Sequence, residues 1–236
     1  MNDYLNSKRK LKAVIRKTSE FRNRLRVFGK TKIFCIGANK TGTTSLKTAM
    51  QELGFKVGNQ SKAVSLIDDW AERDFKNLIN YCRSAEFFQD IPFSLDYTYQ
   101  AVDQAFKDSK FILTVRDSPE QWYNSVIRFE SKLWGQHGKP PTKYDLQESP
   151  HISKGKLWHI KRLIYDTPED NIYDKQIMIE QYLRHNELAR NYFRHRPDDL
   201  LVLNISDKLS YIKLCKFLGV KKKREVFPWE NRTSEI

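Results

Sequence analysis

Two patterns of apolar and polar positions alternate along the chain. Short apolar runs rich in β-branched and aromatic residues, which are typical of buried strands, cover residues 33–36, 55–58, 85–90, 111–115 and 200–205. Between them, apolar residues recur every three or four positions, as on one face of a helix, within residues 46–53, 61–83, 96–107, 120–133, 174–195 and 210–218. Strands that alternate with helices predict an α/β fold, a parallel sheet of about five strands with helices on both faces.

Residues 134–171 interrupt this alternation. They contain three glycines and four prolines, and only residues 156–165 have the spacing of a short helix. We therefore predict a long irregular insertion. Long loops in compact domains usually serve as lids or binding loops.

The loop between the first strand and the first helix has the composition of an anion-binding turn. It contains a lysine, a glycine and four hydroxyl residues, namely Lys40, Thr41, Gly42, Thr43, Thr44 and Ser45. Backbone N–H groups and the positive end of the helix dipole meet at such a turn, which favours phosphate. The loop differs from the nucleoside triphosphate motif G-x-x-x-x-G-K-[ST], because Thr43 stands where that motif has its lysine.

Other polar residues follow the ends of the remaining strands. Asp90 is the last residue of the run 85–90, and Arg116 and Ser206 come directly after the runs 111–115 and 200–205. The carboxyl ends of parallel strands lie at one edge of a sheet, where ligands bind in such folds. We therefore expect these residues to share that edge with Lys40.

The composition excludes several classes of protein. With 39% hydrophobic and 13% aromatic residues, the chain is too apolar to be disordered. The three cysteines have no paired spacing, and Cys35 and Cys215 lie in apolar runs, so we expect buried free thiols and a reducing compartment. There is neither an apolar run of 18 residues nor a signal-peptide pattern before the first strand. We expect a cytoplasmic protein.

The net charge of +13 is concentrated at the N-terminus. Residues 1–32 hold eleven basic and two acidic residues, which gives +9 and leaves only +4 for the rest, too little to predict a nucleic-acid surface. Six apolar residues and one threonine in this segment roughly follow helical spacing, at Leu11, Val14, Ile15, Thr18, Phe21, Leu25 and Phe28. Residues 1–30 therefore form a basic amphipathic segment. It either contacts an anionic membrane peripherally or docks its apolar stripe on the domain.

The order of residues in the anion-binding loop resembles a known family. The pattern G-x-x-K-T-G-T-T-S-L, from Gly37 to Leu46, resembles the 5′-phosphosulfate loop of sulfotransferases that use 3′-phosphoadenosine 5′-phosphosulfate (PAPS). The resemblance is to the bacterial-type branch and covers nearly all of residues 31–231. It implies a P-loop-type α/β domain over residues 31–236, with residues 134–171 as a lid or acceptor-binding insertion. It also implies PAPS as the donor and no metal.

The resemblance assigns residues to the 3′-phosphate of the donor. In the family an arginine at a strand end and a serine on the next helix bind this phosphate, and Arg116 and Ser125 match them. The serine usually comes eight residues after the arginine, a place that Asn124 occupies here. A basic loop near the C-terminus, with Lys222 and Arg224, would cover the same phosphate. The alternative for Arg116 is an ion pair with Asp117 or Glu120.

Lys40 would stabilise charge on the leaving phosphate oxygen, and a second residue must accept the acceptor proton. Asp90 is the leading candidate, since related branches place a histidine or a carboxylate at a similar site before Ile-Pro or Leu-Pro. Asp90 could instead cap a turn or bind the acceptor. His185 is the rival catalytic residue, although its place on an inward helix face is equally typical of a hydrogen-bonded core histidine.

By analogy we expect the acceptor to be the hydroxyl of a carbohydrate or glycoconjugate. Four aromatic residues of the insertion either stack on sugar rings or form a small core of their own, namely Trp134, Tyr144, Trp158 and Tyr165. Two other functions stay open, a P-loop small-molecule kinase and a non-catalytic module that binds phosphate or sulfate ligands.

Overall fold

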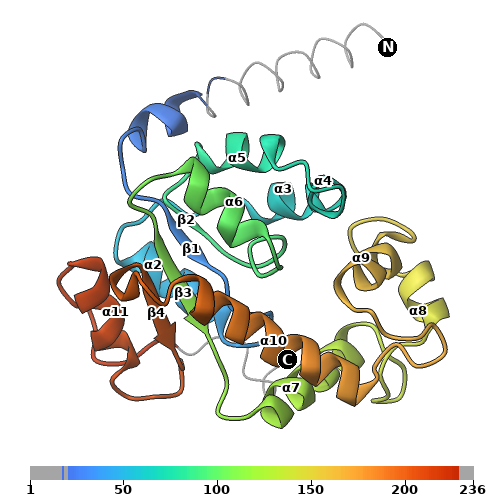
Figure 1. The fold of residues 1–236 in the computed structure, drawn as a ribbon. Coiled ribbons are helices and arrows are strands. Elements are labelled where there is room, and N and C mark those ends of the chain that lie inside the picture. The colour runs from blue at the N-terminus through green and yellow to red at the C-terminus, as the bar shows by residue number, and fades with distance from the viewer. Residues whose placement is uncertain (1–17, 19–20, 229–236) are drawn as a thin grey trace, which may run out of the picture.

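A parallel four-stranded sheet forms the centre of the molecule (Figure 1). The structure is a computed structural model that describes residue 18 and residues 21–228. The strand order is β2-β1-β3-β4. The strands are β1 (Ile33–Cys35), β2 (Phe87–Phe88), β3 (Lys110–Thr114) and β4 (Leu200–Leu203). Ile33 pairs with Phe87 and with Lys110, and Phe111 pairs with Leu200, so β1 and β3 are the central strands.

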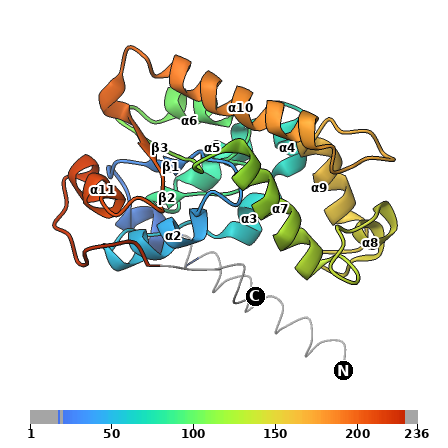
Figure 2. The same ribbon diagram turned by 90° about the horizontal axis from the view of Figure 1, so that it is seen from below.

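Alternate residues of the strands point into two separate cores. Phe34 and Phe111 face a core completed by α5 (Lys76–Cys82), α6 (Thr98–Ala105) and α10 (Lys175–Tyr192). Ile33 and Ile112 face the other core, against α2 (Thr43–Glu52) and α11 (Ser210–Leu218). Figure 2 shows these two groups of helices on opposite sides of the strands. The predicted α/β architecture with helices on both faces is confirmed.

Three predicted elements are shorter or more interrupted in the structure than the sequence pattern suggested. Residues 55–58 form only an isolated bridge, Val57 to Phe87, so the sheet has four strands instead of five. Residues 61–83 form three short helices in place of one, α3 (Gln60–Val64), α4 (Ile67–Ala71) and α5. The β2 strand is two residues long, because the chain turns at Asp90, which has a φ of 67°.

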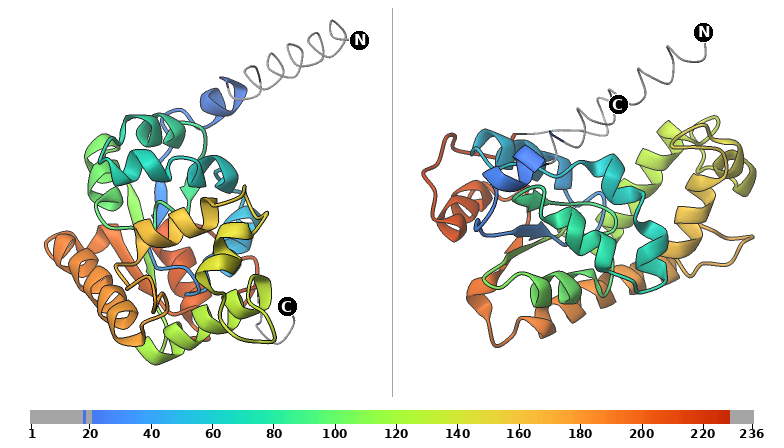
Figure 3. Two further views of the ribbon diagram at one scale, coloured as in Figure 1. Left: turned by 90° about the vertical axis from the view of Figure 1, so that its right-hand side faces the viewer. Right: turned by 90° about the horizontal axis from the view of Figure 1, so that it is seen from above.

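The insertion is more ordered than we predicted. It contains α8 (Lys143–Glu148) and α9 (Lys156–Ile164), between α7 (Pro119–Leu133) and α10. A capping box between Thr142 and Asp145 starts α8, a local signal for a helix within a segment whose prolines favour an irregular chain. Leu146, Leu157 and Ile172 form its small core. In the right panel of Figure 3 this yellow segment lies at the end of the molecule away from α11.

The N-terminal segment ends beside the amino ends of the strands. Lys32 donates to the carbonyl of Ala85 at 2.7 Å, and Lys30 forms an ion pair with Glu86 at 3.2 Å. Leu11, Val14 and Ile15 of the predicted stripe lie outside the described residues. The three cysteines are free and buried, as predicted for Cys35 and Cys215. Among the described helices, none has the length and apolarity needed to cross a membrane.

Candidate active site

The loop between β1 and α2 is pressed tightly against the neighbouring strand ends. A Cβ atom at Gly37 would lie 2.1 Å from the Thr114 hydroxyl, and one at Gly42 would lie 2.7 Å from Ile205. Gly42 also has a φ of 96°, which disfavours other residues. The Thr41 hydroxyl donates to the Ala38 carbonyl at 2.6 Å and lies 2.5 Å from that of Thr114. These contacts fix the backbone from which α2 begins.

The start of α2 has the features of an anion site. Gly42 is its N-cap without a side-chain cap, and its first turn contains no acidic residue. Gly42, Thr43 and Thr44 line a cavity of about 540 Å³ at the carboxyl ends of the strands. The N–H groups of a first helical turn have no acceptors within the helix, and the dipole adds positive potential there.

Lys40 places a cation beside this turn. Its φ is 68°, and its ammonium lies 3.6 Å from the centre of the Phe129 ring on α7. Burial lowers the pKa of Lys40 to about 8, with a smaller contribution from Arg116, while Glu130 and Asp90 act in the opposite direction. Among the residues that the structure describes, none accepts a hydrogen bond from the Lys40 ammonium. It is therefore available to an anion in the cavity.

Arg116 follows β3 and faces the same cavity. Its Nε donates to the Lys40 carbonyl at 2.7 Å, and its backbone N–H donates to the Tyr182 hydroxyl at 3.1 Å. Burial lowers the pKa of the Arg116 guanidinium from its usual value. The alternative ion pairs with Asp117 and Glu120 are not formed. Within the described part of the chain its two terminal nitrogens have no partner, which leaves a planar pair of donors for a ligand.

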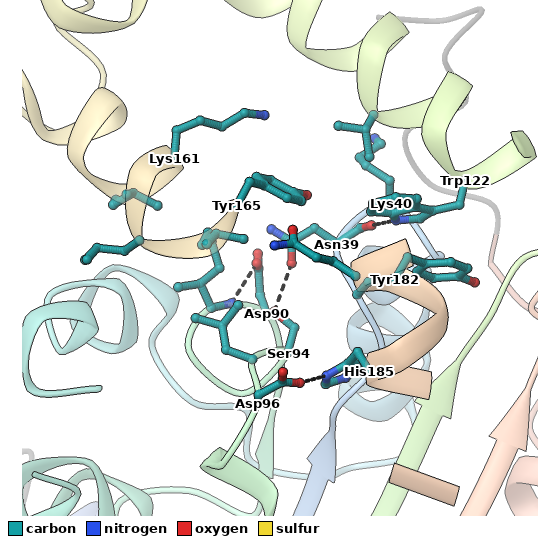
Figure 4. A pocket seen from close by; sticks show the side chains of 18 of the residues that line it. Asn39, Lys40, Asp90, Ser94, Asp96, Trp122, Lys161, Tyr165, Tyr182 and His185 are labelled. Atoms are coloured by element: carbon teal, nitrogen blue, oxygen red, sulfur yellow. Dashed lines mark hydrogen bonds and ion pairs between the residues drawn. The ribbon is translucent and has the colours of Figure 1, made fainter. Parts of the chain in front are cut away.

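Asp90 lies in the turn after β2 and lines the cavity (Figure 4). The Ile91 N–H donates to its Oδ1 at 2.8 Å. Burial raises the pKa of Asp90, against the weaker opposing influence of this N–H, of the Asn39 side chain and of two lysines. A carboxylate in this setting can accept a proton closer to neutral pH than an exposed aspartate.

His185 lines the cavity wall but both of its ring nitrogens are engaged (Figure 4). Nδ1 lies 2.6 Å from Asp96 Oδ1, and Nε2 lies 2.7 Å from the Ile36 carbonyl. Both neighbouring atoms are acceptors, so this geometry suits a ring that donates from both nitrogens. Burial acts to raise the pKa of Asp96, but the hydrogen bond and charge of His185 oppose it and the net shift is downward. The contacts favour a structural role for His185.

The wall opposite the loop is formed largely by α9 and its surroundings. Lys161 on α9 is buried and donates to both carboxylate oxygens of Glu130 at 3.0 and 2.9 Å. The Tyr173 hydroxyl donates to Glu130 at 2.5 Å. Burial lowers the pKa of Lys161 and raises the pKa of Tyr165, whose ring also lines the cavity. This network ties the insertion to α7.

The structure brings only some of the predicted residues together. Lys40, Gly42, Thr43, Thr44, Asp90, Arg116 and His185 line the cavity. Thr41 and Ser45 are buried beside it without lining it. Ser125 is buried on α7 outside the lining, and the alternative Asn124 is exposed. Ser206 is also outside the lining, with its N–H donating to Asn204.

The predicted basic loop lies away from the cavity. Arg224 forms an ion pair at 2.8 Å with Glu52, the last residue of α2, and Lys222 forms one at 2.7 Å with Glu225. The ten-residue α2 is about 15 Å long, so Arg224 lies a helix length from the loop. In this structure Lys222 and Arg224 do not join Arg116.

Several lining residues were not singled out from the sequence. Asn39 accepts from Ser94 at 3.3 Å through Oδ1 and from Trp122 Nε1 at 2.9 Å through its carbonyl (Figure 4). The Trp122 ring stacks on Tyr182 at 4.5 Å. The spacing of Trp122, Val126 and Phe129 marks one face of α7, a signal available in the sequence. Asn39 adjoins Lys40 in the loop, but nothing in its pattern indicates this role.

Comparison with known protein families identifies the family of this chain. A family model described as "Sulfotransferase domain" matches residues 32–236. The chain belongs to the sulfotransferase domain family. It is therefore a transferase that moves a sulfuryl group from a donor to an acceptor, and the predicted family is confirmed. No individual curated protein matches this sulfotransferase in a sequence comparison.

Proposed function

We propose that this sulfotransferase uses PAPS as its donor and transfers the sulfuryl group in line to an acceptor hydroxyl. The observation that carries the proposal is the meeting of Lys40, the start of α2, Arg116 and Asp90 in one cavity. These residues come from the ends of three different strands. Together they offer two separate anion-binding groups and one carboxylate, which suits a donor with two separate anionic groups and an acceptor that gives up a proton.

The β1–α2 loop suits the 5′-phosphosulfate. Its backbone is held by the contacts of Gly37, Thr41 and Gly42, so the N–H groups at the start of α2 need no rearrangement. Lys40 would stabilise the charge that develops on the leaving phosphate oxygen. Fixed donors of this kind contribute about 3–4 kcal/mol each to transition-state stabilisation.

Arg116 suits the 3′-phosphate. Its bond to the Lys40 carbonyl orients the guanidinium while leaving the terminal nitrogens for a bidentate contact. Because Arg116 and Lys40 are joined directly, the two ends of the donor would be held in one fixed relation. The buried Ser125 supports this role less strongly, since it does not line the cavity.

Asp90 is the proposed general base. It would accept the proton of the acceptor hydroxyl as the new S–O bond forms and the bond to the phosphate oxygen breaks. Its raised pKa suits proton transfer near neutral pH. His185 would not supply this function, because its ring nitrogens face Asp96 and the Ile36 carbonyl.

For the acceptor we propose a carbohydrate or glycoconjugate hydroxyl. Trp134 and Tyr165 of the insertion line the cavity, as does Trp70, and these rings could stack on a sugar face. Tyr144 and Trp158 are outside the lining, and Trp158 packs against the insertion core. The cytoplasm is the proposed location.

A labelled-sulfate transfer assay tests this function. The full chain is supplied with PAPS labelled in the sulfuryl group and with separate panels of sugars and phenols. We expect label in a sugar product and release of adenosine 3′,5′-bisphosphate in equal amounts. Transfer to phenols alone would contradict the acceptor class, and no transfer from PAPS to any acceptor, despite donor binding, would contradict the catalytic proposal.

A further inference from the structure

Three large apolar side chains project from the N-terminal segment into solvent. Phe21, Leu25 and Phe28 are 63%, 60% and 87% exposed, at a spacing of four and then three residues. Together with Thr18, they are the described part of the stripe that the sequence predicted. Their exposure shows that this part of the stripe does not dock on the domain, which was one of the two alternatives.

The position of the segment is set by other residues. Val27 is 1% exposed, and its carbonyl accepts from Lys32 at 3.5 Å. Arg24 donates to the Asn80 side chain on α5 at 3.1 Å. These contacts hold residues 24–32 on the domain while Leu25 and Phe28 point away from it. The blue segment beside α5 can be followed in Figure 1.

Positive charge surrounds the exposed apolar side chains. Arg22 and Arg26 are exposed, and no acidic residue occurs between Phe21 and Thr31. Cations beside exposed Phe and Leu are the composition of helices that lie in the interface of an anionic bilayer. A protein partner of acidic surface would match the charges but not three projecting apolar side chains.

We propose that residues 21–28 form a contact surface for anionic lipid. Phe21, Leu25 and Phe28 enter the headgroup region, and Arg22 and Arg26 lie against lipid phosphates and carboxylates. The surface adjoins the amino ends of β1 and β2, through Lys30 and Lys32, whereas the cavity is at the carboxyl ends. A membrane-bound molecule would therefore keep its cavity directed away from the bilayer.

Vesicle co-sedimentation of the full chain tests this surface. The probes are vesicles of phosphatidylcholine alone and of phosphatidylcholine mixed equally with phosphatidylserine. We expect binding to the mixed vesicles that weakens with added salt. The triple substitution Phe21→Ser, Leu25→Ser, Phe28→Ser should lower the partition coefficient at least about tenfold. The pair Arg22→Gln, Arg26→Gln should lower it by about tenfold or more.

A matched control uses exposed apolar residues elsewhere. Leu183, Leu209 and Ile212 are 47%, 57% and 41% exposed on or beside α10 and α11, and changing all three to Ser should leave vesicle binding unchanged. Failure of the full chain to bind mixed vesicles would overturn the proposal, as would equal loss in the control. Concentration-dependent dimerisation that the Phe21 triple substitution abolishes, without any vesicle binding, would assign the surface to a second copy instead.

Discussion

The side of the cavity that we propose for the donor, called the donor side below, is built from backbone turns at strand ends, whereas the opposite side is built largely from side chains of α7 and the insertion. On the donor side, Lys40 and Asp90 both adopt positive φ angles of 68° and 67°, and Arg116 is bonded to a backbone carbonyl. On the other side, Lys161 and Glu130 meet across α9 and α7 through long side chains. The first arrangement is fixed by the sheet itself. The second depends on how a separate segment packs.

This difference separates groups that would perform chemistry from groups that would shape the space for the acceptor. Sparsely populated backbone conformations persist only where the surroundings hold them, and such strain is concentrated at functional sites. The insertion also contains two non-glycine residues with positive φ, His137 and Ile152, but its shape depends on its small core and on the Glu130–Lys161 pair. Substitutions on the donor side should therefore lower the rate of catalysis, whereas substitutions on the side of the insertion should lower stability.

The largest effect is expected for Asp90→Asn. If Asp90 is the base, the turnover rate should fall by about 10²–10⁴, because the amide cannot accept the proton. Affinity for adenosine 3′,5′-bisphosphate, measured by calorimetry, should be almost unchanged. His185→Asn is the control for a structural role. This variant should reduce stability. If it instead removes the acid limb of the rate profile, His185 is the base and Asp90 is not.

The same residues predict the pH profile of kcat/KM for the donor. Asp90 must be ionised, so the rate should fall in acid with a midpoint above that of an ordinary aspartate, since burial raises its pKa. Lys40 must be protonated, so the rate should also fall in alkali near its pKa of about 8. An anionic ligand beside Lys40 would raise that pKa, and the alkaline limb of kcat should lie higher. Coincident alkaline limbs would contradict the assignment of Lys40 to the donor.

Lys40→Met should lower the transfer rate at least about a hundredfold, because it removes one fixed charged donor. Methionine keeps an apolar chain against Phe129, so the free energy of unfolding should change little. The rate and the urea midpoint measure the two effects. Activity within about threefold of the wild type would exclude Lys40 from the phosphosulfate site.

Arg116→Ala should weaken binding of adenosine 3′,5′-bisphosphate by about 2–4 kcal/mol and binding of AMP far less, because AMP lacks the 3′-phosphate. Titration calorimetry of both ligands measures the difference. Arg224→Ala is the matched control at the far end of α2, where the arginine is paired with Glu52. A selective loss in Arg224→Ala would mean that the C-terminal loop moves to the donor.

The smallest effect on transfer is expected at the contact between α7 and the insertion. Glu130→Gln leaves Lys161 buried without a charged partner and should lower the free energy of unfolding by about 3 kcal/mol, measured with denaturant. The double variant Glu130→Gln, Lys161→Met should recover part of that loss. Donor affinity in the double variant, measured at a pH well below the Lys40 pKa of about 8, should stay within about threefold of the wild type, since Glu130 acts on the donor side through the pKa of Lys40. A larger loss of donor affinity would show that the two sides of the cavity are coupled.

The sequence allowed more to be predicted on the donor side for a physical reason. A strand, a glycine turn and a helix start are local, so the spacing of Gly37, Lys40 and Gly42 sufficed to predict the turn that borders the cavity. The shared position of Asp90 and Arg116 at one edge of the sheet was predicted from its parallel strands. The pairing of Lys161 with Glu130 joins residues 31 positions apart and has no local pattern. The short β2 and the separate helices α3, α4 and α5 also depend on packing that periodicity does not record.

The central claim is that the cavity holds two anionic groups of one nucleotide, and wild-type ligand selectivity tests it most directly. Calorimetric titrations of the full chain would compare adenosine 3′,5′-bisphosphate, AMP and ATP with Mg²⁺ under one set of conditions. The account predicts that the bisphosphate binds at least about tenfold more tightly than AMP. It also predicts that the bisphosphate binds more tightly than ATP with Mg²⁺. Equal affinity for the bisphosphate and AMP, or tighter binding of ATP with Mg²⁺, would contradict it.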